Sequence, residues 1–114
     1  MSTKPHVTPY IRLSFRTSVD DHGSMYGRGI AELCRGIRAT GSLNKATKEM
    51  GMAYSKAWRI IKHTEEELGI QLLERQGAHG SCLTEQGLAL LEAYDELEKD
   101  LSQYADQRLK EILK

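Results

Sequence analysis

Apolar residues recur every three or four positions along most of the chain, which is the spacing of amphipathic helices. The first such run, residues 29–40, predicts a helix that ends at Gly41, because glycine suits a left-handed C-cap. A shorter helix is expected over residues 43–50, with Ser42 as its N-cap and Gly51 closing it. The two runs therefore give consecutive helices joined by a very short link.

A third helix is predicted over residues 53–68, directly after the glycine that closes the second. Its apolar stripe consists of Ala57, Ile61, Thr64 and Leu68. The small Ala46 lets the second and third helices approach closely, Gly51 allows the turn, and Ala57 faces back into the junction. These are the steric requirements of a helix-turn-helix.

Strand periodicity appears on both sides of these helices. Residues 10–16, YIRLSFR, alternate apolar and polar side chains and are predicted to form a strand. Residues 71–75 and 81–83 predict two short strands around the glycine-containing tip QGAHG, a hairpin of the kind called a wing. We therefore expect a mainly α protein with a small β-sheet, in which a winged helix-turn-helix occupies residues 1–83.

The remaining residues, 84–114, predict one long helix with Thr84 as its N-cap and Glu85 in its first turn. A coiled-coil seam with spacings of four, three, four and three is formed by Leu90, Tyr94, Leu97, Leu101 and Tyr104. Such a helix spans about 45 Å, which is longer than one small domain can bury alone. A second copy of the chain is the simplest cover, so we interpret this segment as a dimerisation helix.

The two parts of the chain carry opposite charges, although its 16 basic and 16 acidic residues cancel overall. Residues 1–62 contain 11 Lys and Arg against 4 Asp and Glu, a net charge of +7. Residues 63–114 contain 5 against 12, a net charge of −7. A basic front attracts a polyanion while an acidic back is repelled by it, so the zero total is compatible with a nucleic-acid partner.

Several protein classes are disfavoured by the sequence. It has no signal peptide, and no apolar run approaches the roughly 18 residues that cross a bilayer, so we expect a cytoplasmic protein without a membrane partner. Cys34 and Cys82 lie far apart without a CxxC motif, which predicts two reduced and buried thiols. No catalytic arrangement or glycine-rich phosphate loop is visible, so neither an enzyme nor a cofactor is expected. A metal site is not expected either, because no ligand spacing relates His6, His22, His63 and His79.

Taken together, these features resemble the amino-terminal DNA-binding domain of the molybdate-responsive regulator ModE, itself similar to the winged helix of LysR-type regulators. The resemblance covers roughly residues 8–105 and rests on YIRLSF, a Gly-Arg-Gly lead into the first helix, GSLNKATKEMGMAYSKAW, LLER and LTEQG. It implies a homodimeric transcription regulator that inserts helix 53–68 in the major groove of double-stranded DNA and touches the backbone with its wing.

Three departures from the ModE pattern are visible. The family wing is usually longer and richer in glycine than RQGAHGSC, which implies a shorter reach, and Ala53 stands where a serine is expected. Full-length ModE regulators continue into molybdate-binding domains, for which this chain leaves no room, so we expect no small-molecule effector site within it.

The candidate DNA-binding residues are cationic or polar. On the third helix Ser55, Lys56 and Arg59 are expected at base edges, because a recognition helix presents its first turns to the groove. Arg59 is the candidate for a bidentate contact with guanine, and Lys62 for a phosphate. The other candidates for backbone contacts are Ser42, Asn44, Lys45 and Lys48 in the second helix, Tyr54 at the start of the third, and Arg75 and His79 in the wing.

Structural alternatives stand beside these roles. A cationic helix face is in general an ordinary solvated surface, Tyr54 could equally anchor the turn by packing, and Trp58 is expected in the core. The rival function is a winged-helix protein–protein interaction module that has lost DNA binding and docks a partner with its long helix. The cationic face counts against this rival, because a docking helix more often exposes an aromatic or aliphatic patch.

Overall fold

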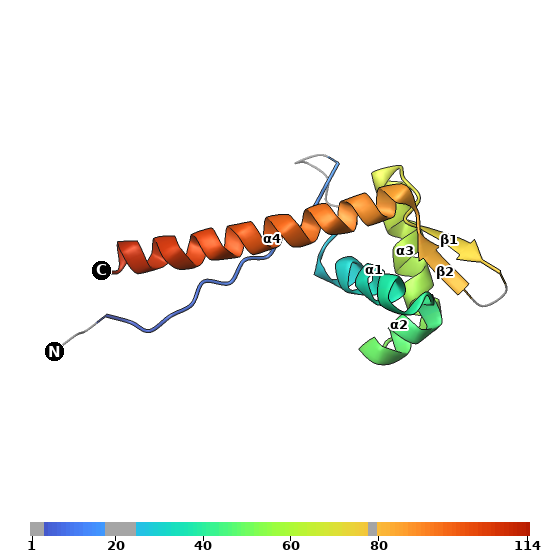
Figure 1. Cartoon of the computed structure of the whole chain (residues 1–114), viewed down its shortest axis with the longest axis horizontal. Coiled ribbons are helices and arrows are strands. Elements are labelled where there is room, and N and C mark those ends of the chain that lie inside the picture. The colour runs from blue at the N-terminus through green and yellow to red at the C-terminus, as the bar shows by residue number, and fades with distance from the viewer. Residues whose placement is uncertain (1–3, 18–24, 78–79) are drawn as a thin grey trace.

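The computed structural model describes residues 4–17, 25–77 and 80–114, which form four helices and one two-stranded antiparallel sheet (Figure 1). The helices are α1 (Arg28–Thr40), α2 (Leu43–Met50), α3 (Tyr54–Leu68) and α4 (Glu85–Ile112), and the strands are β1 (Leu73–Gln76) and β2 (Gly80–Leu83). The first three helices and the hairpin form a head, from which α4 extends as a rod (Figure 1). The chain therefore has the predicted fold class, a winged helix-turn-helix followed by a long carboxy-terminal helix.

Local capping sets the helix-turn-helix. The Ser42 side chain accepts a hydrogen bond from the backbone N–H of Lys45, at 3.2 Å, which satisfies one of the free donors at the start of α2. Gly41 and Gly51 end α1 and α2 with φ of 74° and 68°, a left-handed conformation that glycine adopts without strain. The predicted boundaries of α2 are therefore confirmed.

Close packing brings α1 and α2 together at two small residues. A Cβ atom added to Gly36 would lie 2.7 Å from the Cβ of Ala46, closer than two carbon atoms can approach. The close approach at Ala46 is thus between α1 and α2, whereas the prediction placed it between α2 and α3, and its partner Gly36 was not indicated by the sequence pattern. Ala57 and Ile61 of α3 are fully buried on the other side of the junction.

The core of the head extends into α4. Leu91 and Tyr94, from the first turns of that helix, are fully buried in the hydrophobic cluster that also contains the buried side chains of α1 and α3. Tyr94 packs against the rings of Phe15 and Tyr26, with both centroid distances at 5.6 Å. The first part of α4 therefore belongs to the same hydrophobic core as the helix-turn-helix.

The amino-terminal strand prediction is wrong. Residues 10–16 contribute one isolated bridge, in which Phe15 and Tyr26 exchange backbone hydrogen bonds of 2.8 and 3.0 Å. The predicted alternation is present, because Ile11, Leu13 and Phe15 are half-buried and the residues between them are exposed. The inward side chains face α4 and the core instead of a sheet, and the hydroxyl of Tyr94 donates to the carbonyl of Leu13 at 2.9 Å. Alternation thus reflects packing of an extended segment beside α4 (Figure 1).

Candidate nucleic-acid interface

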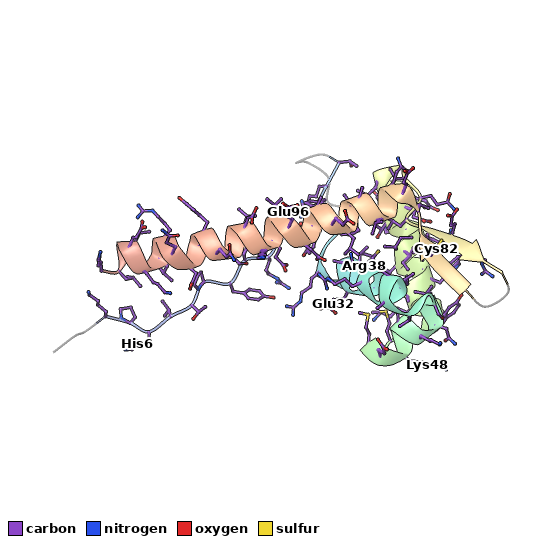
Figure 2. The ribbon with its side chains drawn as sticks, in the orientation of Figure 1. His6, Glu32, Arg38, Lys48, Cys82 and Glu96 are labelled. Carbon is purple, nitrogen blue, oxygen red and sulfur yellow. The ribbon has the colours of Figure 1, made fainter. Side chains whose placement is uncertain are left out.

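The start of α2, the start of α3 and the wing meet around a hollow of about 460 Å³. Three cationic side chains line it, Lys45 and Lys48 from α2 and Arg75 from β1, and the described residues around it include no carboxylate. Lys48 lies on α2, at the end of the head away from α4 (Figure 2). The hollow therefore concentrates positive charge where three elements converge.

Backbone contacts hold the wing at the edge of this hollow. The N–H of Ser81 in β2 donates to the carbonyl of Gly41, in the turn between α1 and α2, at 2.9 Å. Ser81 is also paired with Arg75 across the hairpin, so the residue that bonds Gly41 lies directly opposite the cation. This arrangement fixes Arg75 next to the amino-terminal end of α2.

The α2 candidates occupy different environments. Asn44 and Lys45 are exposed, and Asn44 also lines the hollow. Ser42 lines it too but is only 9% exposed, and its hydroxyl is already engaged in capping α2. We therefore assign Ser42 a local structural role, and the exposed polar side chains that α2 directs to the hollow are those of Asn44 and the two lysines.

The face of α3 that points away from the core carries Ser55, Lys56 and Arg59. All three are exposed, and within the described part of the chain their side chains make no hydrogen bond or ion pair. Ala57 and Ile61 occupy the opposite, buried face, as the apolar stripe predicted. The first two turns of α3 thus present two cations that are unpaired among the described residues.

Tyr54, the first residue of α3, is 43% exposed and lines the hollow. Its ring is therefore accessible from the same side as Lys45 and Lys48. Because Tyr54 is not buried, its exposure does not favour the alternative role of anchoring the turn by packing.

Lys62 differs from the other cations of α3. Its ammonium lies 3.1 Å from Oε1 of Glu65 and 4.6 Å from the centre of the Trp58 ring. The charge of Lys62 is therefore already balanced by the carboxylate of Glu65, which weakens its case as a phosphate contact. Sequence spacing could have suggested this pair, because residues three apart on a helix are neighbours.

Trp58 is partly buried against the core and touches the wing. The guanidinium carbon of Arg75 lies 5.2 Å from the centre of its ring. This contact joins α3 to β1, which are separate segments of the chain, so no local sequence pattern predicts it. The remaining wing candidate, His79, lies outside the described residues.

The seam predicted on α4 divides into two parts. Tyr94 is 1% exposed in the core of its own chain and cannot contact a partner, and Leu90 is partly buried against that core. Leu97, Leu101 and Tyr104 are 41%, 37% and 66% exposed. The surface available to another chain therefore begins at Leu97, one turn after the core ends.

Among the described residues, no group of three or more His, Cys, Asp and Glu side chains is placed to hold a metal ion. No helix in the described ranges is both long enough and apolar enough to span a membrane.

A sequence profile of the family described as "Bacterial regulatory helix-turn-helix protein, lysR family" matches residues 32–88, half of the chain, from α1 through the wing to the start of α4. The chain belongs to this lysR family. The family consists of DNA-binding regulators and not of enzymes, which agrees with the prediction from sequence. No curated protein sequence is a significant match.

Solved structures of lysR-type proteins share the fold. The complex of the CbnR DNA-binding domain with DNA is 23% identical, covers 72% of this chain and 93% of its own, and has a TM-score of 0.59. The BenM DNA-binding domain with catB site 1 DNA is 28% identical, covers 70% of this chain and 88% of its own, and has a TM-score of 0.56. Full-length CbnR, with 24% identity and a TM-score of 0.56, matches 68% of this chain over 27% of its own.

Proposed function

We propose that this lysR-family chain is a homodimeric, sequence-specific transcription regulator of the ModE type that places α3 in the major groove of double-stranded DNA. The observation that carries the proposal is the cationic hollow, which Tyr54 of α3 helps to line, together with the exposed polar face at the start of the same helix. Phosphate contacts position a protein on a duplex and base-edge contacts specify the sequence, and the two neighbouring surfaces supply one of each.

The base-reading surface in this proposal is the start of α3. Arg59 carries two parallel donors that match O6 and N7 of guanine, and Ser55 and Lys56 lie in the same two turns. The hollow takes the DNA backbone, with Lys45, Lys48 and Arg75 neutralising phosphates around the amino-terminal end of α2. The BenM DNA-binding domain, whose structure contains DNA, supports a duplex partner for this fold.

The exposed part of α4 supplies the dimer contact in this proposal. Leu97, Leu101 and Tyr104 form an apolar face whose burial against the same face of a second copy is favourable. Two related α3 helices then read a roughly palindromic site with half-sites one or two helical turns apart. The ModE-type assignment is supported by the motifs GSLNKATKEMGMAYSKAW and LTEQG, and no effector is assigned to this chain.

The test is selection of bound duplexes from a randomised pool, followed by fluorescence-anisotropy titration at two salt concentrations. We expect a twofold-symmetric consensus and, if about six phosphates are neutralised, a log–log salt slope of about −5. The combined change Lys45→Ala, Lys48→Ala and Arg75→Ala should flatten this slope by about 3. Failure to retain any duplex at low salt would overturn the proposal in favour of the protein-interaction rival.

A matched control removes the same number of positive charges from α4. The change of Lys99, Arg108 and Lys110 to alanine leaves the hollow and α3 intact. We expect the salt slope of this control to remain near that of the unmodified protein. Equal flattening in both triple variants would show that bulk charge, and not the hollow, attracts DNA.

A further inference from the structure

Four side chains link the recognition helix to the wing, and one of them, Arg75, also lines the cationic hollow. Trp58, Lys62 and Glu65 come from α3, and Arg75 comes from β1. We propose that Glu65 and Trp58 are positioning residues that hold the wing and deliver Arg75 to the DNA backbone in a fixed place. This inference rests on the proposed function, because it concerns how the cationic hollow is built.

Glu65 fixes where the wing begins relative to α3. Glu65 is 8% exposed, and its Oε2 accepts hydrogen bonds from the backbone N–H groups of Leu72 and Leu73, at 2.7 and 3.2 Å. Hydrogen bonds from N–H groups to an ionised carboxylate are about twice as strong as neutral ones. Glu65 of α3 therefore holds the backbone at Leu72 and at Leu73, the first residue of β1.

The second oxygen of Glu65 acts on the cations. Oε1 lies 3.1 Å from the ammonium of Lys62, which in turn lies 4.6 Å from the centre of the Trp58 ring. The guanidinium of Arg75 lies 5.2 Å from the same ring. Two cations at one indole would repel each other, and the carboxylate of Glu65 offsets the charge of Lys62. Glu65 thus stabilises the position of the Arg75 guanidinium on the Trp58 ring as well as the backbone of β1.

The ring of Trp58 is the surface on which the Arg75 guanidinium is held. An indole is the aromatic ring that attracts cations most strongly, and the flat guanidinium of arginine stacks on such a ring. Arg75 and Ser81 are the two residues that line both the space beside Trp58 and the cationic hollow. Arg75 therefore lies between the indole of Trp58 and the place where a phosphate would bind. Holding its side chain there lowers the conformational entropy that is lost on DNA binding.

An NMR measurement without DNA tests the contact between Arg75 and Trp58 directly. Protons above an aromatic ring resonate upfield, so in the NMR spectrum of the whole protein the side-chain methylene protons of Arg75 should be displaced upfield. Trp58→Leu should abolish this displacement, and Glu65→Gln should reduce it, because the amide no longer balances Lys62. Glu66→Gln, at the exposed neighbouring position, should leave it unchanged. Random-coil shifts for Arg75 in the unmodified protein would overturn the inference.

Arg75→Ala provides a second variant that does not disturb the core, because Arg75 is exposed. It should move the indole N–H resonance of Trp58, the single tryptophan of the chain. An unchanged indole resonance would also contradict the proposed contact, whether or not Trp58→Leu folds.

DNA-binding measurements separate a positioning role of Trp58 from a merely structural one. Trp58→Leu should weaken binding to the selected duplex about two- to fivefold, the size of a cation–π contact at an exposed site. In the Arg75→Ala background the same change should cost almost nothing, because there is no guanidinium left to position. Equal losses in both backgrounds would make Trp58 a packing residue only. If no duplex binds at all, the proposed function fails, whereas the NMR result still decides whether Trp58 and Glu65 hold the wing.

Discussion

Arg35 of α1 and Asp95 of α4 form a two-pronged ion pair, in which Nη2 and Nε of the guanidinium lie 2.8 and 3.1 Å from Oδ1 of the carboxylate. The pair follows directly after Tyr94, the last fully buried side chain of α4. It therefore marks the point at which α4 stops being part of the head. Beyond it, Leu97 and Leu101 are exposed, so the free part of the helix starts from a fixed base.

The first prediction concerns this ion pair. Asp95→Ala should lower the free energy of unfolding by about 1 kcal/mol, because paired side chains that are one-third exposed lose part of their attraction to solvent. The loss should shrink at high salt, which screens the attraction. Urea denaturation at two salt concentrations measures both effects. Asp100→Ala removes the same charge from an exposed position on α4, and an equal loss there would show that the pair adds nothing.

The second prediction concerns the entry of α4. A Cβ atom at Gly87 would lie 2.3 Å from the carbonyl oxygen of Leu72, so the backbones approach more closely than a side chain allows. Gly87→Ala should therefore destabilise the protein by about 3 kcal/mol. Gly29→Ala, in the first turn of α1 with nothing within 4 Å, should be neutral or stabilise by about 0.5 kcal/mol. Thermal unfolding of the two variants decides, and similar Tm values would contradict the steric argument.

Local rules explain the parts of the fold that the sequence predicted well. Ser42 and Gly51 each act on their nearest backbone groups, and the boundaries of α2 followed from them. The exposed positions of Ser55, Lys56 and Arg59 followed from helical periodicity alone. Such features depend on neighbours in the chain, which a single sequence contains.

The parts that the sequence predicted poorly depend on tertiary partners. Alternation in residues 10–16 specifies two faces but not whether a strand or a helix covers one of them, and here α4 does. The spacing on α4 likewise could not separate Tyr94, which packs in its own core, from Leu97, which is exposed. Glu65 reads as one of three consecutive acids, and only folding brings it to the backbone of Leu72.

The third prediction contrasts two cations of α3. Arg59→Ala should weaken binding to the selected site by about 1–3 kcal/mol and relax base preference at one position, because Arg59 is exposed and unpaired among the described residues. Lys62→Ala should weaken all duplexes equally and by less than Lys45→Ala does, because Glu65 already balances Lys62. Titrations against the selected and a scrambled duplex measure this. Equal losses on both duplexes for Arg59→Ala would remove it from base readout.

The fourth prediction concerns the two thiols. Burial raises the pKa of Cys34 to about 11 from 9.0, so its thiol remains protonated and shielded at pH 8. The prediction that both thiols are buried is wrong for Cys82, which lies in the hairpin and is partly exposed. A thiol reagent should therefore modify Cys82 quickly and Cys34 only upon unfolding. Because the folded chain holds the Cys34 proton more tightly than the unfolded chain, stability should fall as pH rises above about 9. Mass spectrometry of partly labelled protein identifies the modified residue, and early labelling of Cys34 would contradict its burial.

The fifth prediction concerns the free part of α4. Leu101→Glu places a charge in the exposed apolar face, and if that face meets a second copy, the charge must lose its water on association. The dimer dissociation constant should then rise at least tenfold, which sedimentation equilibrium measures. Gln103→Glu adds the same charge at another exposed position of α4, off the Leu97–Leu101 face, and should leave the constant nearly unchanged.

This pair of variants also connects assembly to DNA recognition. If two copies read two half-sites, Leu101→Glu should weaken binding to the whole palindrome while leaving affinity for a single half-site intact, because the head is unchanged. Loss of half-site binding as well would mean that the substitution damages the head. A single species of one-chain mass in the unmodified protein, with full affinity for the palindrome, would show that α4 does not join two copies and that each head binds DNA alone.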